Sequence, residues 1–204
     1  MKISKFWLLI FTLILAGIFF GFFFERPHNF RGSVIDPASK APDFTLISSQ
    51  GGEYNLQTKT GKYKLLFFGY TFCPDVCPTT LYEMKEIKAR LRDKAENIEF
   101  IIITVDPDRD SQEQLSKYLA SFDESFYGLT GSEAELEKVW KDYGVFREIQ
   151  PIDNSLGYLV DHTSRLYLIN SDNELMMTYL NDTSLEDIVL DLNYLLKKDD
   201  LGEK

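Results

Sequence analysis

The organisation of this chain is set by residues 64–80, KLLFFGYTFCPDVCPTT, which contain its only two cysteines, Cys73 and Cys77. The apolar run from Leu65 to Phe68 is typical of a strand that is buried on both faces. A helical pattern of apolar positions follows it, so we expect both thiols where a strand gives way to a helix. Thiols confined to one such place favour metal or redox chemistry over a structural disulfide.

Outward from this stretch, short apolar strands alternate with amphipathic helices. The pattern predicts strands at 43–48, 64–70, 100–105, 127–130, 158–161, 165–170 and 175–180. It predicts helices at 79–94, 111–122, 132–143 and 185–196, two of which open with a capping box. This alternation predicts an α/β fold with a central mixed, mainly parallel sheet, helices on both faces and a final antiparallel hairpin.

Composition limits the classes of function. The chain has 204 residues, of which 44% are hydrophobic, enough for one compact domain with its own core. Its formal net charge is -10, which argues against a nucleic-acid partner because phosphate binding needs clustered Lys and Arg.

The N-terminus predicts a membrane anchor. Residues 6–24 carry no charge and are long enough to cross a bilayer of about 30 Å as one helix. A cleaved signal peptide is the competing interpretation, but no small-residue cleavage site follows the run.

We therefore expect a single-pass protein. Its parts are a cytoplasmic N-terminus at 1–5, the transmembrane helix at 6–24, a tether at 25–41, the domain at 42–197 and a polar tail at 198–204. Lysines ahead of the span favour a cytoplasmic N-terminus, although arginines after it reduce the asymmetry. The expected location is the bacterial inner membrane, with the soluble domain on the periplasmic side.

Four interpretations of the cysteine pair remain open from the residues alone. A disulfide across so small a loop constrains the unfolded chain only weakly. A structural zinc site wants four N or S ligands, and a redox dithiol usually has two residues between its cysteines instead of three. Copper is the fourth, since Cu(I) favours thiolates and imidazole accepts either copper state.

The helix start bears on thiol chemistry. Pro78 suits the first helical position, and Cys77 would then lie at a helix N-terminus, where the pKa of a thiol is lowered. The negative charge of Asp75 opposes that effect.

We expect different roles for the two histidines. His28 lies in the tether, and we interpret it as solvated and incidental. His162 follows an apolar strand, where a lone histidine is by default a surface residue, but the dithiol lacks a third ligand that His162 could supply.

Nearby charged residues are weaker candidates. Asp161 could orient His162, as carboxylates often do for metal-bound histidines. Asp106 follows a buried strand at the sheet edge that carries the cysteines, so it could approach the site. Arg109, between two aspartates, is most simply part of a solvated loop, and the aromatic rings of Tyr70 and Phe72 are assigned to core packing.

Residues 68–79, FGYTFCPDVCPT, resemble the signature of the Sco/SenC family of membrane-anchored copper proteins. Three further stretches are similar to family blocks and come in the family's order: 105–110 (VDPDRD), 128–131 (GLTG) and 160–163 (VDHT). Together they cover most of residues 43–195, and the N-terminal anchor also matches.

The resemblance implies a thioredoxin-like fold and one copper ion, as Cu(I) or Cu(II), bound by Cys73, Cys77 and His162. It implies a role in assembling the dinuclear copper centre of cytochrome c oxidase on subunit II, with an upstream copper donor. Such a protein is a metallochaperone and not an enzyme in the strict sense. The alternatives are a thiol–disulfide oxidoreductase that reduces the copper-receiving cysteines or other extracytoplasmic thiols, and a redox sensor or peroxide-consuming protein on the same fold.

Overall fold

The computed structural model describes residues 7, 10–15, 28–153 and 157–202. No helix within these ranges is long and apolar enough to cross a membrane. The expected anchor at 6–24 falls mostly outside the described residues, as do residues 203 and 204 of the expected tail.

The core of the molecule is an eight-stranded mixed sheet with the order β1-β10-β9-β4-β5-β6-β2-β3. Its strands β4, β5 and β6 run parallel, whereas β9 is antiparallel to β4 and β10 is antiparallel to β9. The strand bounds are Ser33–Lys40 (β1), Thr45–Ser48 (β2), Glu53–Asn55 (β3), Tyr63–Gly69 (β4), Ile98–Thr104 (β5), Tyr127–Thr130 (β6), Arg165–Ile169 (β9) and Glu174–Leu180 (β10).

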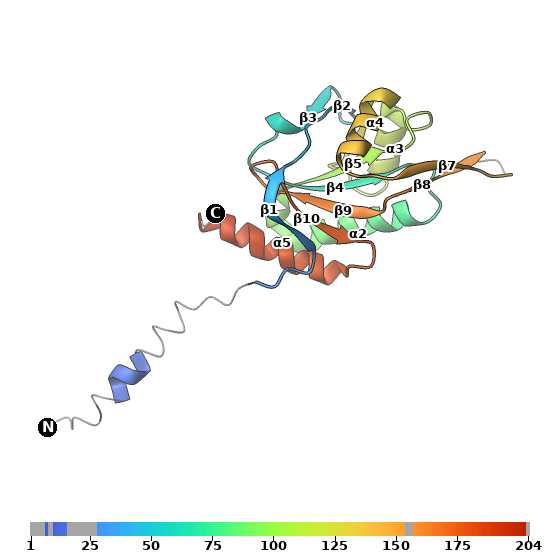
Figure 1. Ribbon diagram of the computed structural model, residues 1–204. Coiled ribbons are helices and arrows are strands. Elements are labelled where there is room, and N and C mark those ends of the chain that lie inside the picture. The colour runs from blue at the N-terminus through green and yellow to red at the C-terminus, as the bar shows by residue number, and fades with distance from the viewer. Residues whose placement is uncertain (1–6, 8–9, 16–27, 154–156, 203–204) are drawn as a thin grey trace.

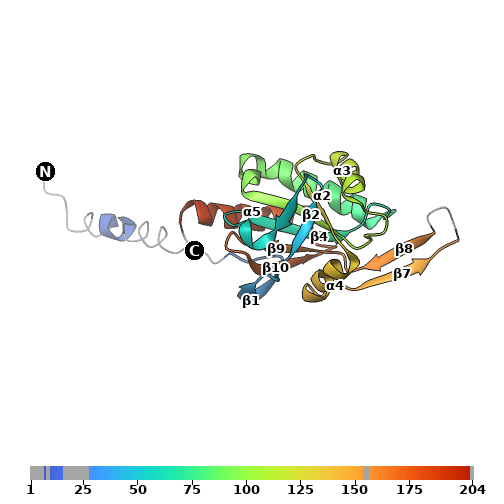
Figure 2. The same ribbon diagram turned by 90° about the horizontal axis from the view of Figure 1, so that it is seen from above.

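Four helices in the described domain cover the sheet: α2 (Val76–Leu91), α3 (Gln112–Ala120), α4 (Glu133–Asp142) and α5 (Leu185–Asp200). Two short 3-10 turns, η1 (Leu56–Thr58) and η2 (Arg92–Asn97), complete the connections. Figures 1 and 2 show α2 and α5 together on one face of the sheet and α4 on the other. The parallel β4–α2–β5 unit, followed by the β9–β10 hairpin and α5, is the expected thioredoxin-like arrangement. The sheet is mixed, as expected, but it is not mainly parallel, because only the β4–β5 and β5–β6 pairs are parallel.

Strand β4 lies inside the sheet, and all seven of its residues are buried. It pairs in parallel with β5 from Tyr63↔Ile98 to Gly69↔Thr104. A strand covered on both faces needs a continuous apolar run, which is why this pattern could be recognised in the sequence. At its carboxyl end, β4 continues directly into the loop that carries Cys73.

Residues 28–41, the described part of the expected tether at 25–41, are more ordered than their prolines suggested. Residues Ser33–Lys40 form β1, an edge strand antiparallel to β10, and its register shifts between Val34 and Ser39. Pro37 lies within this irregular part, which is where a sheet edge accepts a residue without an N–H group.

The interpretation of His28 as solvated is wrong. Its Nε2 lies 2.8 Å from Oδ1 of the fully buried Asp191, and its ring stacks on Tyr194 at 4.1 Å. The other oxygen of Asp191 accepts the N–H groups of Arg31 and Gly32. The segment that begins at His28 is thus fastened to α5.

A separate two-stranded ribbon projects from the domain, at the end away from the C-terminus of α5 (Figures 1 and 2). It consists of β7 (Arg147–Pro151) and β8 (Tyr158–His162), paired antiparallel from Arg147↔His162 to Pro151↔Tyr158. Strand β7 was not predicted because its sequence, REIQP, has little apolar alternation. Residues 154–156 of the connection lie outside the described residues.

Candidate metal centre

The loop after β4 brings the two cysteines to the carboxyl end of the sheet. Cys73 follows β4 by four residues, and Cys77 lies in the first turn of α2. A glycine is required at position 69, because a Cβ there would come within 2.5 Å of the Phe67 ring and 3.1 Å of Cys77 Sγ. The strand can therefore end close against the second sulfur.

Helix α2 begins earlier than expected. Asp75 is the N-cap and Val76 the first helical residue, so Pro78 is the third helical residue and not the first. An early start is compatible with Pro78, because the N–H groups of the first turn have no partner within a helix. It also directs the N–H of Cys77 to Cys73 Sγ, 3.4 Å away.

The two thiols lie in different environments. The pKa of Cys73 is lowered, first by its hydrogen bond with Cys77 and further by contacts with His162 and with the N–H groups of residues 75 and 77. The pKa of Cys77 is raised, because a thiolate at Cys73 is its hydrogen-bond partner and because only 1% of Cys77 is exposed. The Cys77 side chain and the helix start thus favour a thiolate at Cys73. For Cys77 itself, where the sequence left the helix start and Asp75 in opposition, the pKa is raised.

His162 completes the site from a position 85 residues after Cys77. It ends β8, and its Nε2 lies 3.6 Å from Cys77 Sγ. Its Nδ1 is 3.1 Å from the carbonyl oxygen of Thr163 and is placed to donate a proton to it. Metal-bound histidines commonly donate their second ring N–H to such an acceptor, which leaves the other nitrogen free as a ligand.

Aromatic side chains surround the imidazole. The rings of Phe67 and Tyr70 meet it edge to face, with centroids 6.1 and 5.8 Å away. The Tyr70 hydroxyl accepts the N–H of Val160 at 3.1 Å. These two rings therefore pack in the core, as expected, and also define one wall of the site.

The structure places the remaining candidates away from this cluster. Asp161 is exposed and, as a neighbour of His162 on a strand, points to the opposite face of the ribbon. Asp106 is fully buried, but its carboxylate accepts hydrogen bonds from Arg109 and from the Tyr158 hydroxyl. Asp161 could have oriented His162 or been an exposed charge at the strand end, and it is the latter; the contact at Nδ1 is made by the carbonyl of Thr163.

The segment around Arg109 is not a solvated loop. The Arg109 side chain is 15% exposed, and Asp110 is fully buried. Asp110 accepts hydrogen bonds from the Thr71 N–H, the Thr71 hydroxyl and the Thr104 hydroxyl. Burial raises the pKa of Asp110. Asp110 thus fastens the loop that leads to Cys73.

Sequence reasoning missed these supporting residues. The alternating charges of 108–110 gave the pattern of a solvated turn, and the contacts that bury them come from residues 39 to 52 positions away. The one available signal was their place directly after the buried strand β5, at the same sheet edge as the cysteines.

The donor set suits a soft metal ion. The Sγ atoms of Cys73 and Cys77 and one ring nitrogen of His162 all lie within 4.8 Å of one another. Metal–ligand bonds of about 2.0–2.3 Å allow two ligands of one ion to be about 4.6 Å apart at most, so small side-chain movements would seat an ion. Within the described ranges this group contains no fourth Cys, His, Asp or Glu, which disfavours structural zinc.

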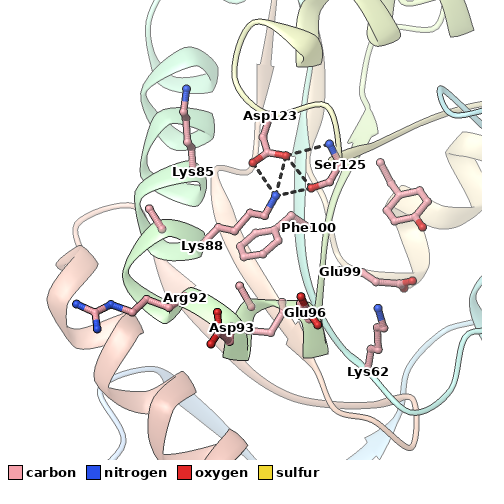
Figure 3. A pocket seen from close by; sticks show the side chains of 14 residues that line it. Lys62, Lys85, Lys88, Arg92, Asp93, Glu96, Glu99, Phe100, Asp123 and Ser125 are labelled. Atoms are coloured by element: carbon pink, nitrogen blue, oxygen red, sulfur yellow. Dashed lines mark hydrogen bonds and ion pairs between the residues drawn. The ribbon is translucent and has the colours of Figure 1, made fainter.

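A second hollow, of about 590 Å³, lies at the opposite edge of the sheet (Figure 3). It is lined by four basic and four acidic side chains, among other residues, and Lys88 is held there by Asp123 and Ser125. Residues at the amino end of β5 line this hollow, whereas the cysteines follow the carboxyl end of β4, so the two places are separate.

Fold and site together define a thioredoxin-like domain with a Cys–Cys–His cluster at the carboxyl end of its central strand. The sequence model of the SCO1/SenC family matches residues 33–197, and the chain belongs to that family.

Individual relatives are similar over most of the chain. The SCO2-like protein of Rickettsia felis is 36% identical over 148 residues, which are 72% of each chain. The copper-bound structure of ScoI from Bradyrhizobium japonicum is 35% identical, with a TM-score of 0.70 over 76% of this chain and 99% of that one. The apo Sco1 structure from Thermus thermophilus is 34% identical, with a TM-score of 0.74 over 84% of this chain and 99% of that one.

Proposed function

We propose that this protein is a copper metallochaperone that binds one copper ion through Cys73, Cys77 and His162. The observation that carries the proposal is the convergence of these two sulfurs and one imidazole nitrogen within 4.8 Å, from positions up to 89 residues apart. Thiolates stabilise Cu(I) and imidazole accepts either copper state, so the site suits an ion that is received and passed on. The copper bound to the Bradyrhizobium japonicum relative supports the choice of metal.

The proposed task is assembly of the dinuclear copper centre of cytochrome c oxidase on its subunit II, with copper supplied by an upstream donor. This step rests on the family resemblance of the motifs. The half-buried position of Cys73 and His162 supports transfer, because a recipient thiol can approach the ion from solvent.

The proposed location follows from the N-terminal sequence. Residues 6–24 would anchor the chain in the inner membrane, with the copper domain on the periplasmic side. Protease protection in spheroplasts tests this arrangement: the domain should be digested from outside, and its survival in intact spheroplasts would contradict it.

Metal binding is tested by anaerobic Cu(I) titration of the full chain in detergent. One equivalent should bind, and Ala at Cys73 or Cys77 should abolish tight binding, while Ala at His162 should weaken it about 10- to 100-fold. A variant that kept the wild-type affinity would remove that residue from the ligand set. Ser at Thr79, the exposed last residue of the motif and not a proposed ligand, is a matched control.

A thiol–disulfide oxidoreductase is the second candidate, favoured by the asymmetry of the thiols. The Cys73 thiolate would attack a substrate disulfide, and Cys77 would then attack Cys73, lose its proton and release the substrate as a dithiol. Two electrons pass from the protein, which ends as the Cys73–Cys77 disulfide. Replacing His162 with Ala should spare reduction of an oxidised subunit II peptide and abolish copper transfer, which separates the two functions.

A further inference from the structure

The attachment of the β7–β8 ribbon decides where the imidazole lies. As strands, β7 and β8 pair only with each other in the described part of the chain, and neither joins the eight-stranded sheet. Both sulfurs, by contrast, belong to the loop and helix that continue from the central strand β4. Strand β8 reaches the sheet through a short connection to β9, which begins at Arg165 and pairs with β4, so the distance between His162 and the dithiol depends on this connection and on the contacts between the ribbon and the domain.

Alongside Arg147, whose Nε donates to the carbonyl oxygen of Val105, Arg109 makes several of these contacts. Its Nη1 donates to the carbonyl oxygen of Tyr158 at 3.0 Å, and its guanidinium lies over the Tyr158 ring, 3.6 Å from the centroid. The buried carboxylate of Asp106 holds both partners: one oxygen accepts from Arg109 Nε and the other from the Tyr158 hydroxyl at 2.7 Å. This closed set of contacts fixes the start of β8.

The same guanidinium also faces the cysteine loop. It lies 4.9 Å from the ring centroid of Phe72, which directly precedes Cys73, and 5.7 Å from that of Tyr70. The Tyr70 hydroxyl in turn accepts the N–H of Val160, two residues before His162. One partly buried cation thus lies between the loop that carries Cys73 and the strand that carries His162.

We propose that Arg109 is a positioning residue of the metal centre, which fixes His162 over the two cysteines without touching the ion. The role rests on the proposed function, because it presumes that His162 is a ligand. Arginine suits it better than lysine, since a planar guanidinium can stack on aromatic rings and donate several hydrogen bonds at once. An ammonium group would keep the charge but lose that geometry.

The position of Arg109 predicts a selective defect. The dithiol does not depend on the ribbon, so loss of Arg109 should leave a two-sulfur site that still binds Cu(I). Binding of Cu(II) should suffer, since it gains from the imidazole. Outer contacts of metal ligands typically contribute 10- to 100-fold to affinity. A smaller change, within about 3-fold, is expected for Cu(I).

The test uses the full chain in detergent and compares Arg109→Gln, Arg109→Lys and the control Arg90→Gln. Arg90 is a surface arginine paired with Glu186 and lies outside the site. We expect both Arg109 variants to lose 10- to 100-fold in Cu(II) affinity, with an altered Cu(II)–thiolate absorption, and the control to match the wild type. In the metal-free protein, amide exchange at Val160 should accelerate in the Arg109 variants alone. If Arg109→Gln kept the wild-type Cu(II) affinity and the wild-type protection of the Val160 amide, the positioning role of Arg109 would be overturned.

A double-mutant cycle shows whether Arg109 acts through His162. In a His162→Ala background, Arg109→Gln should cause no further loss of Cu(II) affinity, whereas an independent effect would add. Additive losses would overturn the positioning role. If His162→Ala alone leaves Cu(II) affinity unchanged, the proposed ligand set and this role both fail. If only Arg109→Gln is silent, the ligand set stands and this role fails.

A variant of Tyr158, the partner of Arg109, separates a loss of positioning from a general folding defect. Tyr158→Leu removes the ring over which Arg109 lies and the hydroxyl that donates to Asp106, while leaving the pair of Arg109 with Asp106 in place. It should reproduce the Cu(II) defect and the faster exchange at Val160. Wild-type Cu(II) binding by a folded Tyr158→Leu protein would also overturn the proposal.

Discussion

Cys73 and Cys77 show how strongly position decides the chemistry of identical side chains. They are four residues apart, yet Cys73 is half-buried and Cys77 is buried. The Cys77 side chain hydrogen-bonds to Cys73, and N–H groups at the helix start further stabilise a thiolate there. The half-buried sulfur therefore carries the negative charge and the buried one keeps its proton.

This asymmetry predicts selective alkylation. In the reduced, metal-free protein, iodoacetamide at pH 7 should label Cys73 at least about ten times faster than Cys77, because only the thiolate is nucleophilic. Since the pKa of Cys73 is lowered, its labelling should persist as the pH falls below the range in which a free cysteine stops reacting. Mass spectrometry of time points identifies the labelled residue. Equal labelling of both cysteines would contradict the assigned environments.

Lys64 is a buried cation in the central strand. Its Nζ donates to Asn173 Oδ1 at 2.6 Å and to the carbonyl oxygen of Lys62 at 2.8 Å. Burial lowers its pKa from 10.5 to about 8, although Glu99 opposes the shift. Between these values the unfolded chain binds more protons than the folded one, so this residue makes the free energy of unfolding rise with pH from about 8 upward.

Lys64→Met should remove that pH dependence. The stability of the wild type relative to the variant should increase by roughly 2 kcal/mol between pH 7 and 9.5, since one pKa unit corresponds to about 1.4 kcal/mol. Urea unfolding at both pH values measures the difference, and Lys138→Met, at an exposed lysine, is the control. A stability difference that is constant with pH would mean that folding leaves the pKa of Lys64 unchanged.

At the scale of elements, the sequence predicted what local patterns encode. The buried strands, the helices and the capping box of α4 were confirmed, because apolar periodicity and cap residues act within a few positions. The box expected at the start of α3 is only half formed, since Ser111 accepts the Gln114 N–H but the Gln114 side chain donates to Thr71 instead. Strands β1 and β3 and the ribbon strand β7 were missed. The partner of β1 is far along the chain, β3 is only three residues long, and β7 pairs with the neighbouring β8 but has a largely polar sequence.

The same contrast between local sequence patterns and contacts that form only on folding applies to the candidate site. The motif located both cysteines, and the resemblance pointed to His162. The roles of Arg109, Asp110 and Tyr158 could not be predicted, because each depends on contacts between segments that only the folded sheet brings together. Likewise, the sequence around His28 does not indicate that its partner is Asp191, 163 residues later.

Helix α5 supplies an element-scale prediction through Asp191. Its carboxylate accepts from the N–H groups of Arg31 and Gly32 and binds His28, so Asp191→Ala leaves several donors without their partner. The segment around residue 31 should then open more often, and trypsin should cut after Arg31 at least about ten times faster. Glu186→Ala, at an exposed position of the same helix, should leave the rate unchanged. Unchanged cleavage in Asp191→Ala would show that the segment is held by other contacts.

At the scale of the whole molecule, the proposed copper ion would connect parts of the chain that the backbone keeps apart. Cys73 and Cys77 belong to the start of α2, whereas His162 belongs to a ribbon outside the main sheet. A ligand that binds only the folded state stabilises it, by about 2.7 kcal/mol at a free concentration of 100 Kd. The two neighbouring cysteines can also bind copper in the unfolded chain, and that binding reduces the gain. The net stabilisation therefore reports mainly on what folding adds, which is the imidazole.

Copper should therefore stabilise the wild type more than a variant that lacks only the imidazole. We expect one equivalent of Cu(I), under anaerobic conditions, to raise the Tm of the full chain by up to about 5–10 °C, since 1 kcal/mol shifts the Tm of a domain of this size by about 2–4 °C. His162→Ala should show less than half of that shift, and Cys73→Ser with Cys77→Ser should show none. Differential scanning calorimetry with and without copper measures all three. An equal rise in the wild type and in His162→Ala would mean that the ribbon does not contribute to metal binding, because the stabilisation would then come from the dithiol alone.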